Sequence, residues 1–214
     1  MPPEEQLINV LVLRRTGLQA ADIGWIKEWR PDQLLQHLCD TALGGWCDLP
    51  NQHSGPIRNA FRKASQSGNR EALLEHLSAA VIQPVQALWD KRGLLFHLAR
   101  QSTWYPLLST LRAAHGHDYF WANIVAFDLR TQRLANAYPR DRQVYCGFGP
   151  GGLRGLNAVL GRARTAALEQ QVALLWAKYL ADTLAWPGPR PEAYLVQWWL
   201  CELSQAPTSI WSTG

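Results

Sequence analysis

Apolar residues recur at intervals of three and four positions along most of the chain, and no convincing stretch alternates between apolar and polar residues. Such spacing places side chains on one face of an α-helix, whereas a half-buried strand needs alternation. The longest such face follows Asn69, a residue suited to capping a helix, and comprises Leu73, Leu74, Leu77, Val81 and Leu88. The pattern therefore predicts an all-α fold, a compact multi-helix domain.

Glycine, proline and capping residues set the limits of the expected helices. Gly17 should end the first helix, Asp22 should cap the second, and Pro84 should kink or split the long helix after Asn69. The expected helices cover residues 4–15, 22–30, 31–43, 56–67, 69–92, 94–100, 103–114, 117–130, 151–160, 165–184 and 191–203.

A chain of 214 residues is long enough for one domain with a real hydrophobic core. We divide this domain into an N-terminal helical part (1–100), a motif-bearing catalytic part (101–206) and a tail (207–214). No apolar run is long enough to span a bilayer, and the acidic start of the chain is unlike a secretory signal. The four cysteines lack zinc-type spacing, which predicts reduced thiols, no metal site and a cytoplasmic protein without a membrane partner.

The positive charge of the chain is concentrated in one window. Between Leu129 and Arg164 there are seven arginines, no lysine and a single acid, Asp141, so this window carries a charge of +6. The planar guanidinium suits bidentate recognition of phosphate better than an ammonium group does. We expect the seven arginine side chains to bind DNA, the alternative being a solvated basic face. They are Arg130, Arg133, Arg140, Arg142, Arg154, Arg162 and Arg164.

A glycine-rich segment, residues 147–155, lies inside the same window and leads into an expected helix. Gly149, Gly151 and Gly152 permit positive φ angles and a close approach of the backbone to a partner. The N-terminus of a helix attracts phosphate, and Arg154 in the first turn would add charge. The segment therefore predicts a phosphate or pyrophosphate site, although an ordinary tight loop between two helices has the same composition.

Three segments in the second half of the chain carry a family resemblance, which covers the chain from about residue 100. They are Asp118-Tyr119-Phe120-Trp121-Ala122-Asn123-Ile124-Val125-Ala126-Phe127-Asp128-Leu129, Gly147-Phe148-Gly149-Pro150-Gly151-Gly152-Leu153-Arg154-Gly155-Leu156 and Gln197-Trp198-Trp199-Leu200-Cys201-Glu202. In this order they resemble the phage family of α-glutamyl/putrescinyl thymine pyrophosphorylases, or amino acid:DNA transferases. Gly152 stands where an alanine is common, and Trp199 stands where a histidine is usual.

The resemblance implies a fold like that of the helix-hairpin-helix DNA glycosylases. It also implies an enzyme of base hypermodification, in the host cytoplasm if the chain is phage-encoded. Such an enzyme displaces pyrophosphate from 5-pyrophosphoryloxymethyluracil in double-stranded DNA with an amino acid, such as glycine or serine, or another amine. No cofactor is expected beyond magnesium brought by pyrophosphate. The alternatives are a helix-hairpin-helix glycosylase and a non-catalytic DNA-binding partner of a modification complex.

Several residues of the matching segments suit this chemistry. Asp128 and Glu202 are candidate general bases for the incoming amine, and Arg154 is a candidate to stabilise the departing pyrophosphate. Their plainer alternatives are an ion pair of Asp128 with Arg130 and a surface position for Glu202. Trp121 and Trp198 are candidates to stack on the flipped base, and Asn123 is a candidate to recognise its edge. Cys201 is a candidate thiolate for attack on C6, the alternative being a buried, inert thiol.

Overall fold

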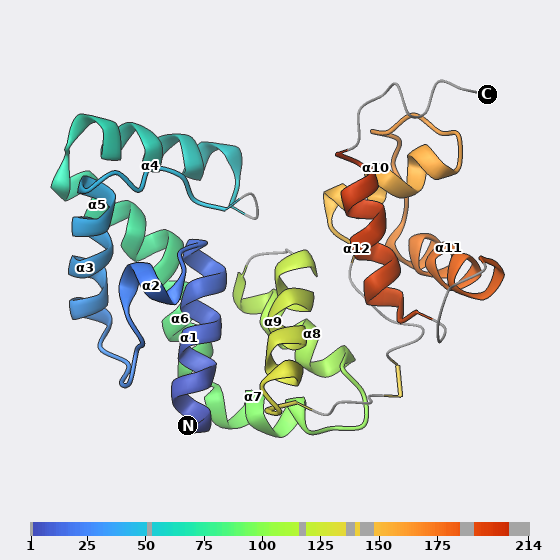
Figure 1. Ribbon diagram of the computed structural model, residues 1–214, viewed down its shortest axis with the longest axis horizontal. Helices are drawn as coiled ribbons and strands as arrows, with labels where there is room; N and C mark the ends of the chain where they lie inside the picture. The colour runs from blue at the N-terminus through green and yellow to red at the C-terminus, as the bar shows by residue number, and fades with distance from the viewer. Residues whose placement is uncertain are drawn as a thin grey trace.

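The computed structural model describes residues 2–50, 53–115, 119–135, 140–141, 148–184 and 191–205, and every regular element within these ranges is helical (Figure 1). The all-α prediction is therefore confirmed for this part of the chain, and none of its helices is long and apolar enough to cross a membrane. One π-helical turn, η1 (Ser78–Ile82), joins two helices. The α-helices are α1 (Pro3–Thr16), α2 (Ala20–Ile23), α3 (Pro31–Leu43), α4 (Gly55–Ser67), α5 (Arg70–Leu77), α6 (Gln83–Trp89), α7 (Arg92–Ala99), α8 (Tyr105–His115), α9 (Tyr119–Thr131), α10 (Pro150–Val159), α11 (Gln170–Thr183) and α12 (Ala193–Leu203).

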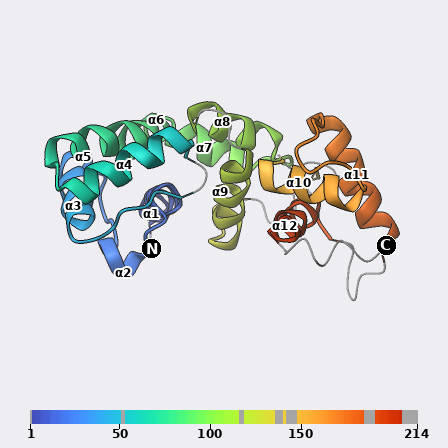
Figure 2. The ribbon, with the colours of Figure 1, turned by 90° about the horizontal axis from the view of Figure 1, so that it is seen from above.

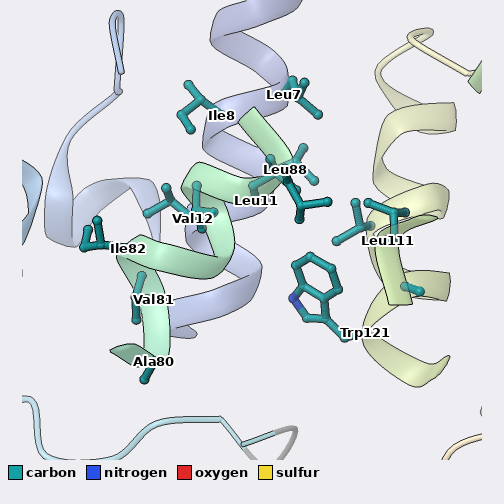
Figure 3. Packing of buried hydrophobic residues seen from close by; sticks show 14 of the residues in the cluster. Leu7, Ile8, Leu11, Val12, Ala80, Val81, Ile82, Leu88, Leu111 and Trp121 are labelled. Carbon is teal, nitrogen blue, oxygen red and sulfur yellow. The ribbon is translucent and has the colours of Figure 1, made fainter. Parts of the chain in front are cut away.

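The larger of two hydrophobic clusters is built from α1 and the helices up to α9. Helix α1 lies at its centre, since apolar residues occupy most of its faces and an all-round apolar helix must be buried. Its fully buried side chains include Leu7, Ile8, Leu11 and Val12. Figure 3 shows Val12 near Val81 and Ile82, while the indole of Trp121 reaches from α9 toward α1.

Two of the predicted helix limits are confirmed by their hydrogen bonds. Gly17 ends α1 in the left-handed conformation, with φ 73° and its N–H donating to the Leu13 carbonyl. Asn69 caps α5, because its Oδ1 accepts a hydrogen bond from the Ala72 N–H at 3.0 Å. Both arrangements satisfy backbone groups that a helix end leaves unpaired.

The predicted helix over residues 22–30 is wrong. Asp22 does not cap a helix there; it lies within α2 and accepts a hydrogen bond from the Gln19 N–H at 2.7 Å. Gly24, with φ 73°, follows α2 directly. The apolar residues Trp25, Ile26 and Trp29 therefore belong to the connection between α2 and α3.

The break predicted at Pro84 is confirmed and takes the form of η1. Pro84 lies in the first turn of α6, where its missing N–H is tolerated, and the wider π-helical turn precedes it. The predicted start of α11 at residue 165 is too early, because the preceding residues form a turn. Asn157 holds that turn, donating from Nδ2 to the carbonyls of Arg164 and Ala166 at 3.3 and 2.8 Å.

The smaller cluster consists of α10, α11 and α12 and lies to one side of the larger one (Figures 1 and 2). Helix α9 contributes to both, since Phe127 packs against the smaller cluster. Beside it, the Arg130 Nη1 pairs with Glu192 Oε2 at 2.7 Å, and the guanidinium lies 4.9 Å from the Phe127 ring centre. The two clusters thus divide after α9, and the predicted tail lies outside the described residues.

Candidate functional site

A cavity between α1, the connection that follows it, and α9 combines aromatic, amide and charged side chains; we call it the α1–α9 cavity. Its volume is about 540 Å³, within the range of small-molecule sites. One face of each helix lines it, because the lining residues recur at helical spacing. Helix α9 contributes Trp121, Ile124 and Asp128, followed by Gln132; α1 contributes Asn9, Val10, Leu13 and Arg14.

The charged groups of the cavity form one ion pair across the two helices. Arg14 donates from Nε to Asp128 Oδ2 at 2.5 Å and from Nη2 to Asp128 Oδ1 at 2.9 Å. The side chain of Asp128 is 16% exposed and that of Arg14 is 48% exposed. A bidentate contact fixes the plane of the carboxylate. The ion pair considered from the sequence was with Arg130, but that side chain pairs with Glu192.

Gln132 supplies a buried acceptor without a partner. Its Oε1 is shielded from solvent and receives no hydrogen bond from the residues that the structure describes, although its side chain lines the cavity. Leaving such an oxygen unsatisfied costs about 1–3 kcal/mol, so an N–H donor that reached it after a rotation of the amide would recover part of that cost. Sequence analysis missed Gln132, although its distance of four residues from Asp128 places both on one face of a helical turn.

Arg14 was also missed, and no local signal reveals it. Its partner Asp128 is 114 residues away in the sequence. The pairing depends on α9 packing beside α1, which only the folded chain defines.

Trp25 forms the outer wall of the cavity and is held in place by α1. Asn9 accepts a hydrogen bond from the Ile26 N–H at 3.0 Å and donates to the Ile26 carbonyl at 2.8 Å. The Trp25 Nε1 donates to Glu5 Oε2 at 3.2 Å. Trp25 is 38% exposed and Trp121 only 1% exposed. One indole therefore lies at the mouth of the cavity and the other lies in its floor.

The glycine-rich segment serves contact between helices. The positive φ angles that these glycines permit do not occur, because Gly149 precedes α10 with φ −80° and Gly151 and Gly152 lie inside α10 without positive φ. A Cβ on Gly152 would lie 2.9 Å from Gln197 Nε2, and one on Gly155 would lie 2.5 Å from the Leu200 carbonyl carbon. These glycines, with Gly151 against Cys201, allow the backbone of α10 to approach α12.

The seven arginines do not form one group. Arg130 is largely enclosed by Glu192 and the rings of Trp104 and Phe127. Arg164 is half-buried, with Nη1 3.5 Å from the Ser204 carbonyl. Arg142 lies outside the described residues. The exposed members are Arg133, Arg140, Arg154 and Arg162.

The candidates on α12 lie apart from the α1–α9 cavity. Glu202 is exposed, accepts a hydrogen bond from Trp198 Nε1 at 3.1 Å, and lines an apolar groove between the helices of the smaller cluster. Burial raises the pKa of the Cys201 thiol, the Glu202 carboxylate raises it further, and Arg154 opposes both. A raised pKa disfavours the thiolate that attack on C6 would require.

Asn123 is buried on a face of α9 other than the one that lines the cavity. Among the described residues, no group of three or more histidine, cysteine, aspartate or glutamate side chains is arranged to hold a metal ion. In comparisons with protein-family models, curated proteins and solved structures, none matches this chain.

Proposed function

We propose that the protein is a transferase that accepts a modified thymine, flipped out of DNA, in the α1–α9 cavity and replaces its pyrophosphate with an amine. The observation that carries the proposal is the wall formed by α9. Trp121 and Asp128, both in the first of the segments that resemble the amino acid:DNA transferases, line one cavity together with the unpartnered Gln132 oxygen.

The lining of the cavity suits a pyrimidine. A base outside its duplex needs flat apolar surfaces for stacking and polar groups for its edge. Trp25 offers indole surface at the mouth, whereas the buried Trp121 closes the floor. The Gln132 Oε1 suits the N3–H of a thymine, since this group is a donor on the Watson–Crick edge. Recognition of that edge would satisfy the buried oxygen.

Asp128 is the residue to which we assign the proton transfer. In the reaction the amine nitrogen forms a bond to the exocyclic methylene carbon, and the bond from that carbon to pyrophosphate breaks with its electron pair. The amine must also lose a proton, which a carboxylate can accept. Arg14 orients the carboxylate and occupies one direction on each oxygen, and a carboxylate has further lone pairs for an ammonium or amine. Glu202 and Arg154 lie outside this site.

The test uses DNA that carries 5-pyrophosphoryloxymethyluracil, incubated with candidate amines, glycine and serine first. The DNA is digested to nucleosides, which are identified by mass spectrometry, and released pyrophosphate is measured in parallel. A nucleoside that carries the amine supports the proposal. Abasic sites would instead indicate the glycosylase, which also needs a carboxylate, placed near the sugar. Unmodified DNA that is nevertheless bound would indicate the non-catalytic partner.

Two variants locate the reacting carboxylate. Asp128→Asn should slow transfer about 100-fold to 10,000-fold, the usual contribution of a general base, and circular dichroism should report a folded protein. Glu202→Gln makes the same chemical change on α12 and should retain the wild-type rate. A slow Glu202→Gln enzyme with a normal Asp128→Asn enzyme would move the chemistry to the smaller cluster.

A further inference from the structure

A second cavity adjoins the first and shares one wall with it. Its volume is about 500 Å³, and it lies between the connection that follows α2 and the first half of α3. Trp25 lines both cavities. The segment of Trp25 and Ile26 is therefore a partition, which α1 holds through the hydrogen bonds of Asn9 and Glu5.

Most of the ionisable side chains that line this second cavity are basic. Lys27, Arg30 and His37 line the second cavity, and Glu28 is its acid. Arg30 directly precedes α3 and His37 lies within that helix, and both side chains line this cavity. No carboxylate among the described residues pairs with Lys27. Among the described residues the cavity thus presents an ammonium group that forms no ion pair, beside a guanidinium and an imidazole.

The one ion pair in this cavity is easily exchanged. Arg30 Nη2 lies 2.6 Å from Glu28 Oε2, and the two side chains are 57% and 67% exposed. Exposed pairs of this kind contribute about 0–1 kcal/mol. A ligand with two or more negative charges can replace the Glu28 carboxylate on the guanidinium and also engage Lys27, which a single carboxylate does not do.

We propose that the second cavity binds a phosphate or pyrophosphate group that belongs to the substrate held on the other side of Trp25. That the group belongs to a substrate rests on the proposed function; the affinity for the anion does not. Two sources share this chemistry: the pyrophosphate on the modified base, and a backbone phosphate of the DNA strand beside that base. In both cases the base would lie in the α1–α9 cavity, and the bonds that join it to the anion would pass over the exposed rim of Trp25 into the second cavity.

The experiment measures binding by isothermal titration calorimetry with two probes, inorganic pyrophosphate and a short single-stranded thymidine oligonucleotide. Lys27→Ala and Arg30→Ala should each weaken the binding of at least one probe about tenfold, as expected for losing a charge-assisted hydrogen bond. Lys63→Ala is the matched control, because Lys63 is exposed on α4 and the same charge is removed. It should bind both probes like the wild type.

The outcomes separate the two sources and the two proposals. Loss of pyrophosphate binding alone assigns the cavity to the leaving group, and loss of oligonucleotide binding assigns it to the DNA backbone. Wild-type affinities in both cavity variants, or no binding of either probe to the wild type, would overturn the inference. If Lys27→Ala weakens binding but the wild-type protein transfers no amine, the anion site stands and the proposed function is refuted.

Discussion

Replacing Gly155 by alanine tests whether the glycine-rich segment exists for helix packing or for an anion. The new Cβ would lie 2.5 Å from the Leu200 carbonyl carbon and 3.0 Å from the Leu200 Cα, with the carbonyl oxygen closer still. Ordinary contacts begin at 3.4 Å, so α10 and α12 must separate by about 0.9 Å or more. The obstacle is backbone, which cannot move aside as the end of a side chain can.

Forcing extra volume into a packed contact costs about 1–3 kcal/mol and occasionally more, whereas alanine gains up to about 1 kcal/mol over glycine within a helix. We expect a net loss of about 2 kcal/mol, which lowers the melting temperature of a chain of this size by about 4–8 °C. Thermal unfolding followed by circular dichroism measures it. The matched control is Gly93→Ala in α7, where a Cβ meets open space and the stability should stay or rise.

The two interpretations of Gly155 give opposite results. If the segment is a phosphate cradle, Gly155→Ala reduces anion binding and leaves the melting temperature at or above that of the wild type. If the glycines serve the contact between α10 and α12, the melting temperature of Gly155→Ala falls below that of the wild type, whereas that of Gly93→Ala does not. A stable Gly155→Ala protein would refute the packing argument.

Two further predictions concern single residues, Arg133 and His53. Arg133 has φ 61°, a conformation that costs a residue with a Cβ about 1 kcal/mol. Arg133→Gly should therefore raise the free energy of unfolding by up to that amount in urea titrations, and a free energy of unfolding below that of the wild type would contradict this. Burial lowers the pKa of His53 from 6.5 to about 4; the unfolded chain therefore binds the proton first, and stability should be full above pH 6.5 and fall by about 3 kcal/mol as the pH drops toward 4. His53→Gln should weaken that pH dependence. If the urea midpoint changes between pH 7 and pH 4.5 by as much in His53→Gln as in the wild type, His53 does not cause the dependence.

The local features of the fold were predictable because they depend on neighbouring residues. Gly17, Asn69 and Pro84 each act within one helical turn, so their effects on helix limits follow from the sequence. The connection after α2 was mispredicted because its tryptophans resemble a helical face. In the structure the Ile26 backbone is bound by Asn9 of α1, a contact over 17 residues.

The candidate site was only half predictable for the same reason. Trp121 and Asp128 were identified because they stand together in a motif. Arg14 and Trp25 come from the first part of the chain, where no motif marked them, and they reach the cavity only because α1 packs against α9. The glycine-rich segment illustrates the reverse case. Its composition predicts a close approach of two groups, but does not say whether the second group is a ligand or, as here, the backbone of α12.

Helix α9 connects these features, because each of its faces has a different partner. Ala122 and Ala126 are buried in the larger cluster, Phe127 packs on the smaller one, and Trp121 and Asp128 line the cavity. A helix packed on two sides has little freedom to tilt, so the Asp128 carboxylate is fixed both by its own helix and by Arg14. Proton transfer needs a donor and acceptor held within about 3 Å, and groups on packed helices meet that need better than groups on loops. This rigidity is why we assign the chemistry to Asp128 rather than to Glu202, which lies exposed near the end of α12.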